Sequence, residues 1–90
     1  MTEPRDIMIK RLAMRSMRRG IKEMDLILSA YAAAHLDHLS DADLRLYDSL
    51  LSENDHDIYG WITGQANPPA AYAAMVGDIT ALAAGLTKPA

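Results

Sequence analysis

Apolar residues recur along this chain at the three- and four-residue spacing of helices, and no segment alternates apolar and polar positions long enough to predict a strand. Phe is absent, β-branched residues are sparse, and Ala, Leu and Met are abundant, as helices prefer. The pattern predicts an all-α fold, a compact five-helix bundle that forms a single domain over residues 1–90. We expect its core to span about residues 5–84, and residues 85–90 to form a loose tail.

The first two predicted helices meet at Gly20. The first runs from about residue 5 to residue 18, after Pro4, which suits a helix start because an N–H has no helical partner there. Gly20 is expected to end it in the left-handed conformation that glycine adopts without strain. The second helix runs from residue 21 or 22 to about 37. Its buried stripe is expected to comprise Ile21, Met24, Ile27, Leu28, Tyr31 and His35.

Three further helices follow, each with a recognisable start. Ser40, with an acid three residues later, resembles a capping box. Asn54, followed by two acids, begins a short helix that Gly64 ends. A last helix runs from residue 69 to about 84 and stops at Gly85. The predicted inward residues of these helices are Leu44, Tyr47, Leu50, Leu51, Ile58, Trp61, Ile62, Tyr72, Met75, Val76, Ile79, Leu82 and Ala83.

Charge is distributed unevenly along the sequence. Residues 1–22 hold seven Lys or Arg and two acids, whereas residues 23–90 hold two and ten, which together give the net charge of −3. Arg11, Arg15, Arg18 and Lys22 fall on one side of the first helix. Such asymmetry predicts an electrostatic contact surface for a partner. The alternative is a basic helix that packs beside acidic helices of its own fold.

Several classes of protein are disfavoured by the composition. Without cysteine, neither disulfides nor thiolate chemistry can occur. No apolar run approaches the roughly 18 residues of a membrane span, so no direct membrane insertion is expected. The first six residues lack the apolar region of a signal peptide and are too short and acidic for an organelle transit peptide. A cytoplasmic location, in a bacterium rather than an organelle, is therefore expected.

Candidate chemistry is sparse. No serine lies in a nucleophile elbow, and the five isolated glycines form no phosphate-binding loop, so the chain is not expected to be an enzyme. His35 and His38 have a spacing that could hold a metal, with His56 as a further ligand, but nothing in the spacing demands a site. No metal site is predicted.

The alternative function is a small nucleic-acid-binding or regulatory bundle that uses the basic first helix along phosphates. Against nucleic acid stand the acidic pI of about 5.4 and the placement of Trp61 and most of the tyrosines on core stripes, which leaves no evident platform for stacking on bases. Nucleic acid is therefore not expected as a partner.

Three sequence blocks together resemble one protein family. Residues 18–25 read RRGIKEMD and resemble the R-G-x-x-E signature of the SdhE family, the bacterial counterpart of mitochondrial succinate dehydrogenase assembly factor 2. Residues 39–44 and the acidic segment 53–64, ENDHDIYGWITG, are similar to later blocks of that family in order and spacing. The resemblance covers roughly residues 9–83. His56 departs from it, standing where the family often has proline.

The resemblance implies a five-helix assembly factor that binds the flavoprotein subunit of succinate dehydrogenase, and also that of fumarate reductase. In the family this contact promotes covalent attachment of FAD to a histidine of the flavoprotein. FAD therefore belongs to the partner, with no cofactor bound tightly by this chain, although transient contact stays open. The expected partner-binding residues are Arg19, Gly20 and Glu23, extended by Arg11, Arg15 and Arg18.

The residues suggest a part for each of these positions. Gly20 leaves no side chain over the corner, Arg19 offers a planar fork to a carboxylate or to carbonyl groups, and Glu23 caps its own helix or meets a cation of the partner. Four cations along one edge should repel one another, which suggests that a partner neutralises them.

Overall fold

The computed structural model describes residues 3–87, and five α-helices account for most of them. Within that range no strand is present, so the prediction of an all-α five-helix fold is confirmed. The elements are α1 (Arg5–Arg15), α2 (Lys22–His35), the 3-10 turn η1 (Leu36–His38), α3 (Asp41–Leu51), α4 (Asp55–Ile62), the 3-10 turn η2 (Ala70–Tyr72) and α5 (Ala73–Thr87).

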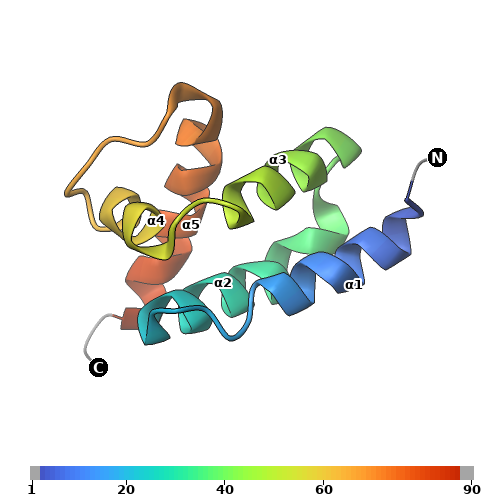
Figure 1. Ribbon diagram of the computed structural model, residues 1–90, viewed down its shortest axis with the longest axis horizontal. Coiled ribbons are helices and arrows are strands. Elements are labelled where there is room, and N and C mark those ends of the chain that lie inside the picture. Colours follow the sequence, from blue (N-terminus) through green and yellow to red (C-terminus); the bar gives the residue numbers. More distant parts are fainter. Residues whose placement is uncertain (1–2, 88–90) are drawn as a thin grey trace.

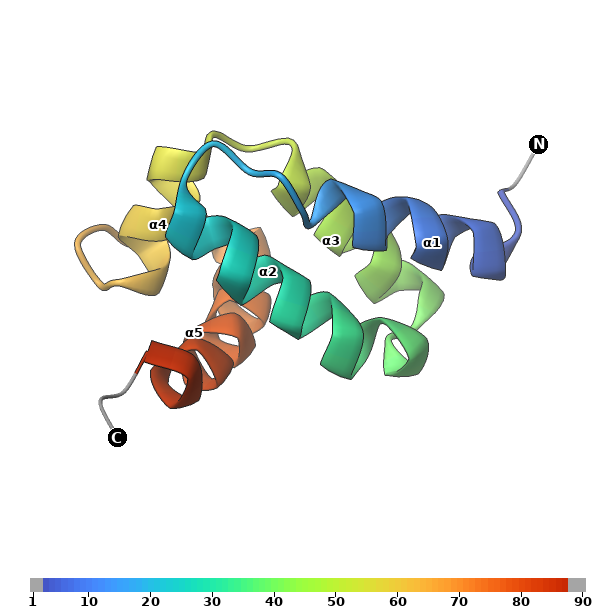
Figure 2. The ribbon, with the colours of Figure 1, turned by 90° about the horizontal axis from the view of Figure 1, so that it is seen from below.

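The helices form an elongated body, 42 × 28 × 22 Å along its principal axes, in which α2 is central (Figure 1). One end of the body is built by α1 and α3, which pack against each other. The opposite end is built by α4 and α5, and α5 also packs on α2. The view from below shows the α1–α2 connection passing close to the start of α4 (Figure 2). This proximity brings the predicted site beside an element more than thirty residues later in the sequence.

The core contains the predicted stripes almost entirely. Ile21, Trp61, Tyr72 and Leu82 are only partly buried and pack against its edge, and His35 is half-buried and stacks on the ring of Tyr31 at 4.7 Å. The predicted residues that are buried are Met24, Ile27, Leu28, Tyr31, Leu44, Tyr47, Leu50, Leu51, Ile58, Ile62, Met75, Val76, Ile79 and Ala83.

Two of the predicted helix starts are confirmed by their hydrogen bonds. The Ser40 hydroxyl accepts a bond from the Asp43 N–H at 3.1 Å, and the Asn54 side-chain oxygen accepts one from the His56 N–H at 2.8 Å. Each bond satisfies an N–H that has no partner within its helix. Gly64, predicted to end the fourth helix, has a φ of 81° and so takes the left-handed conformation in which glycine commonly ends helices.

The end of the first helix was predicted wrongly. α1 stops at Arg15, three residues early, and the residue in the left-handed conformation is Arg18, with a φ of 54°, and not Gly20. The cause is Ser16, which is completely buried. Its hydroxyl bonds the Leu12 carbonyl at 2.8 Å and the Tyr47 hydroxyl at 2.6 Å. This anchor to α3 fixes the chain direction before Gly20 is reached.

The last helix also differs from the prediction at both ends. It begins with the 3-10 turn η2 instead of an α-helical turn at residue 69, and α5 continues through Gly85 to Thr87. A glycine inside a helix is unfavourable by only about 1 kcal/mol, so it need not end one. The part of the predicted loose tail at residues 88–90 lies outside the described residues.

Candidate functional site

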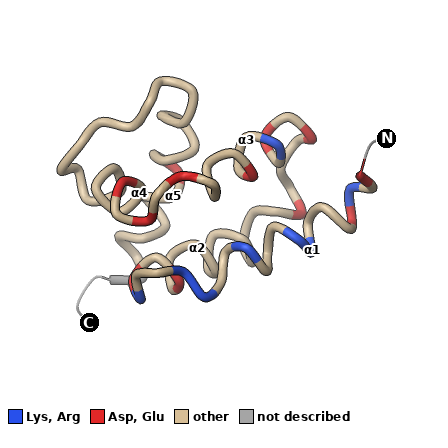
Figure 3. The backbone as a smooth tube through the Cα atoms, in the orientation of Figure 1, with Lys and Arg blue, Asp and Glu red and all other residues tan. Residues whose placement is uncertain are grey.

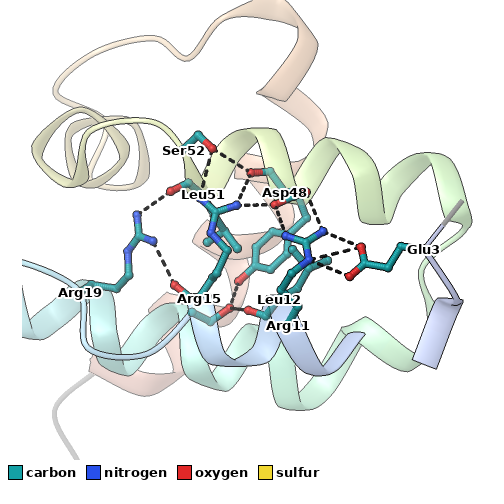
Figure 4. Close-up of polar contacts among 10 residues, drawn as sticks. Glu3, Arg11, Leu12, Arg15, Arg19, Asp48, Leu51 and Ser52 are labelled. Atoms are coloured by element: carbon teal, nitrogen blue, oxygen red, sulfur yellow. Dashed lines mark hydrogen bonds and ion pairs between the residues drawn. The ribbon is translucent and has the colours of Figure 1, made fainter. Parts of the chain in front are cut away.

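The six predicted site residues lie on α1, on the α1–α2 connection and in the first turn of α2, but the structure divides them into two groups. Arg18, Gly20 and Glu23 are exposed. The other three, Arg11, Arg15 and Arg19, are half-buried and turn toward α3 and α4 (Figure 4). The first group is therefore accessible to a partner, whereas the side chains of the second group are partly covered by the protein itself.

Arg11 and Arg15 form an ion-pair network between α1 and α3. One Arg11 nitrogen lies 2.9 Å from a Glu3 oxygen and 2.9 Å from an Asp48 oxygen, and Arg15 pairs with the same Asp48 carboxylate. Arg15 also donates to the Ser52 hydroxyl at 3.1 Å. Hydrogen bonds from Arg11 hold the pKa of Asp48 below its ordinary value of 3.8, and that of Glu3 below 4.5. The network fastens α1 along α3.

Arg19 joins three helix ends. Its Nε donates to Asp55 Oδ1 at 2.9 Å, and its two Nη atoms donate to the Arg15 and Leu51 carbonyls, both at 3.0 Å. The Arg19 and Asp55 side chains are only 12% and 17% exposed. Arg19 thus bonds free carbonyl groups at the ends of α1 and α3 and a carboxylate in the first turn of α4. Its planar fork is occupied within the protein.

Gly20 is held by the same carboxylate. Its N–H donates to Asp55 Oδ2 at 2.7 Å, so Asp55 bonds both the Arg19 side chain and the next backbone amide. A Cβ atom at this position would lie 3.2 Å from that oxygen. A side chain at this position would crowd the carboxylate, so the close approach of Asp55 is the reason that the structure gives for glycine here. The reason predicted from the sequence, a left-handed backbone, does not apply, because Gly20 does not adopt one.

The repulsion expected among the first-helix cations is largely compensated within the fold. Basic positions along α1 run beside acidic positions of α3 (Figure 3), and Arg19 of the α1–α2 connection pairs with Asp55 of α4. For Arg11, Arg15 and Arg19 the alternative stated from the sequence is therefore the correct one: a basic helix packed beside acidic elements. Contact of these three arginines with a partner stays a prediction. Their mutual repulsion is no longer an argument for a partner, because acids of the same chain neutralise them. The same pairing reduces the charge available to phosphates, which disfavours nucleic acid further.

Asp48 and Asp55 are absent from the predicted site, although they organise it. Asp55 was assigned only to the first turn of its helix, where acids favour the helix dipole. Each lies more than thirty residues from its arginine partners, a separation at which no local pattern pairs them. The one feature of the sequence that pointed to these pairs is the separation of charge into a basic part, residues 1–22, and an acidic part, residues 23–90.

Glu23 lies at the rim of a hollow that the sequence did not predict. It is exposed, and no ion pair to it occurs within residues 3–87. The hollow has a volume of about 360 Å³ and is mostly apolar. Its lining comes from α2, α4 with its C-cap, and α5, and consists of Glu23, Ile27, Tyr59, Ile62, Thr63, Thr80, Ala83 and Ala84. A surface that binds at Gly20 and Glu23 would meet this hollow next.

Neither a metal centre nor a membrane span is found in the described part of the chain. No three His, Cys, Asp or Glu side chains of residues 3–87 gather where they could hold a metal ion. No helix in that range has the length and apolar character needed to cross a bilayer. The stacking of His35 on Tyr31 gives that histidine a packing role.

Comparison with known proteins identifies a family. A family model described as "flavinator of succinate dehydrogenase" matches residues 10–83, a range that includes the whole candidate site. Proteins named "succinate dehydrogenase assembly factor 2, mitochondrial" are 52% identical over 61 residues in Meyerozyma guilliermondii, 49% identical over 61 residues in Saccharomyces cerevisiae, and 45% identical over 67 residues in Schizosaccharomyces pombe.

These matches cover most of the chain but less of each relative. They span 68%, 68% and 74% of this chain, and 45%, 38% and 48% of the three relatives in the same order. The chain thus matches less than half the length of these relatives.

The predicted cytoplasmic location is wrong by this comparison. All three relatives are named as mitochondrial proteins, which contradicts it. Because less than half of each relative is matched, the composition of the first residues was a poor basis for a statement about targeting.

The family also decides between an enzyme and a helper protein. Its description as a flavinator, and the naming of its relatives as assembly factors, confirm the prediction that the chain is not an enzyme. The match over residues 10–83, supported by relatives up to 52% identical, confirms the resemblance seen in the three sequence blocks. The chain belongs to the family of succinate dehydrogenase flavinators, which are assembly factors.

Proposed function

We propose that this protein binds the flavoprotein subunit of succinate dehydrogenase and promotes covalent attachment of FAD to it, and that it also serves the flavoprotein of fumarate reductase. The observation that carries the proposal is the family match over residues 10–83, which contains the corner from Arg18 to Glu23. The structure supports it with an exposed corner of fixed geometry.

The proposed contact is centred on the exposed residues Arg18, Gly20 and Glu23. Gly20 presents bare backbone, so a partner surface can approach closely, while Arg18 and Glu23 offer charges of opposite sign on either side of it. Arg11 and Arg15 extend the contact through the third of each side chain that stays exposed. Arg19 contributes by holding Gly20 in place together with Asp55.

The proposed action is positional. No catalytic constellation was found in the sequence, and FAD in this scheme belongs to the partner. Covalent attachment requires the flavin to be held against its acceptor residue, and such alignment can lower a barrier by several kcal/mol. A helper that binds one arrangement of the flavoprotein more tightly than the others shifts the population toward it. The rigid corner suits that selective binding.

Replacement of Gly20 tests the proposal. Gly20→Arg places a bulky cation over the corner and displaces the Asp55 carboxylate, so covalent flavinylation should fall to the level of a strain without this protein. The measurement is in-gel fluorescence of denatured flavoprotein from a strain that carries only the variant. Gly77→Arg is the matched control, because Gly77 is exposed on α5 with nothing within 4 Å of its added Cβ.

The two variants must also be compared for folding by circular dichroism. If folded Gly20→Arg supports wild-type levels of covalent FAD, the corner is not the contact. If the wild-type protein itself neither binds the flavoprotein nor restores flavinylation, the proposed function is wrong altogether.

A further inference from the structure

The exposed large hydrophobic side chains of this protein gather in one region. Among residues whose side chains are described, they are Ile7, Met14, Met17 and Leu26, with exposed fractions of 52%, 73%, 47% and 54%. All four lie on α1, on the α1–α2 connection or in the second turn of α2. We call these four residues the apolar strip.

The strip extends along the chain across the junction of the two helices. Ile7 and Met14 are seven residues apart, two helical turns, and so share one side of α1. The Ser29 hydroxyl donates to the Ser16 carbonyl at 3.3 Å, which seats the residue before Met17 against α2. Leu26 lies one helical turn before Ser29 and lines a shallow hollow with it there. Met17 and Leu26 therefore both lie beside the contact between Ser16 and Ser29 that joins the two segments.

The cations beside the strip are free, unlike those that face α3. Lys10, Arg18 and Lys22 are exposed and form no ion pair within residues 3–87. Three acids lie on the same stretch, Asp6, Glu23 and Asp25. Glu23 lines the separate hollow formed with α4 and α5, and Asp25 lies beside Leu26, within 3.3 Å of the Ser29 hydroxyl. The strip is thus an apolar surface with an excess of positive charge at its rim. Its complement is an apolar surface flanked mainly by carboxylates.

We propose that the apolar strip is a second contact region for the flavoprotein, on a part of that partner that is apolar and flanked by carboxylates. This inference rests on the proposed function and adds residues outside the Arg18–Glu23 corner, which adjoins the strip at Met17. Methionine suits such a surface, because its flexible, polarisable side chain adapts to a partner. Exposed apolar patches on small soluble domains commonly mark interaction sites.

Two other occupants fit less well. A second copy of this chain would present the same excess of cations, so pairing two strips by two-fold symmetry would join surfaces of the same net sign. An anionic bilayer would attract the cations, but it would repel Asp6 and Asp25. A protein surface can oppose each charge with its counterpart.

The test replaces both methionines by glutamine, which keeps side-chain length and charge while removing apolar character. The variant Met14→Gln/Met17→Gln should bind purified flavoprotein lacking covalent FAD about tenfold more weakly in isothermal titration calorimetry, a loss of roughly 1.4 kcal/mol. The matched control is Ala74→Gln/Ala81→Gln, at two exposed positions of α5. Leu26→Gln supplies an independent measurement from the α2 side, where a loss of binding is also expected.

The outcomes separate this inference from the function on which it rests. If wild-type protein binds the flavoprotein and both strip variants bind equally well, the strip is not a contact, while the proposed function stands. If wild-type protein does not bind at all, the proposed function fails first. The inference is also overturned if sedimentation shows a wild-type dimer that the variants lose, or if phosphatidylglycerol vesicles capture wild-type protein and not the variants.

Discussion

Arg19 shows how one side chain can define a site without facing the partner. It bonds two carbonyl groups and a carboxylate, which leaves little of it exposed, and the same carboxylate holds the Gly20 amide. A planar guanidinium can satisfy three acceptors in different directions, whereas an ammonium group is a compact point charge. At this position the shape of the cation matters as much as its sign.

This gives a prediction at the residue scale. Arg19→Lys should lower the free energy of unfolding by about 1–3 kcal/mol, because at least one buried acceptor loses its donor. Arg18→Lys is the matched control, since Arg18 is the adjacent arginine and is exposed. Urea denaturation followed by circular dichroism measures both. Equal stability of the two variants would show that Arg19 is not a structural residue.

At the scale of elements, α1 and α3 are fastened by Asp48 and by the buried Ser16–Tyr47 contact. Burial raises the pKa of the Tyr47 hydroxyl to about 12, so this hydroxyl stays protonated and able to donate at neutral pH. Asp48 behaves oppositely, because its bonds with Arg11 favour the charged carboxylate and depress its pKa. The α1–α3 packing therefore combines two contacts. The Ser16–Tyr47 hydrogen bond keeps its protonation state at neutral pH, whereas the ion pairs of Asp48 are lost when acid protonates the carboxylate.

The pH dependence of stability should reveal the second contact. A carboxylate with a depressed folded-state pKa stabilises the protein fully above its unfolded value near 3.8, and that stabilisation is lost as the pH falls through the lower folded value. Asp48→Asn should thus have a lower melting temperature than wild type at pH 5–7, and the difference should shrink below pH 3.8. Asp78→Asn, which removes an exposed carboxylate on α5, is the control.

Melting curves recorded from pH 7 to pH 3 would decide the matter. A difference between wild type and Asp48→Asn that stays constant over this range would mean that the ionised form of Asp48 is not what stabilises the α1–α3 contact.

Helix starts were predictable from the sequence, and helix ends were less so. Ser40 and Asn54 cap their helices through bonds to residues two or three positions away, so a local pattern contains the information. The end of α1 depends on Ser16 bonding to Tyr47, thirty-one residues later. Likewise, the pairing of the arginines with Asp48 and Asp55 depends on how α1 packs on α3 and on how the α1–α2 connection meets the start of α4. The sequence grouped the candidate residues at one corner but could not show which of them face inward.

At the scale of the whole molecule, the partly buried cations are paired with acids, and the exposed cations named below are not. Arginines along one side of α1 are neutralised by acids of the acidic half, whereas Lys10, Arg18 and Lys22 stay exposed without an ion pair in the described part of the chain. Although the net charge of the chain is −3, the surface beside the Arg18–Glu23 corner is locally positive. Long-range attraction from such a surface speeds encounter with an acidic partner.

Salt dependence tests this at the same scale. Arg18→Glu should weaken flavoprotein binding at low ionic strength, and the difference from wild type should shrink as salt is raised, because exposed charges are screened within about 10 Å at 0.1 M. Arg45→Glu is the matched control, since Arg45 is exposed on α3. Titration calorimetry at several salt concentrations measures both. Identical affinities of wild type and Arg18→Glu at low salt would rule out a contribution from this charge.

The bond between the Gly20 amide and Asp55 makes the corner observable by amide hydrogen exchange. An amide in an exposed connection ordinarily exchanges its proton with solvent quickly, but this one is bonded to a carboxylate at 2.7 Å and should exchange slowly. Its exchange rate then reports directly on whether α4 and the α1–α2 connection are joined. Changes in that rate when the flavoprotein is added would separate a partner that preserves this junction from one that opens it.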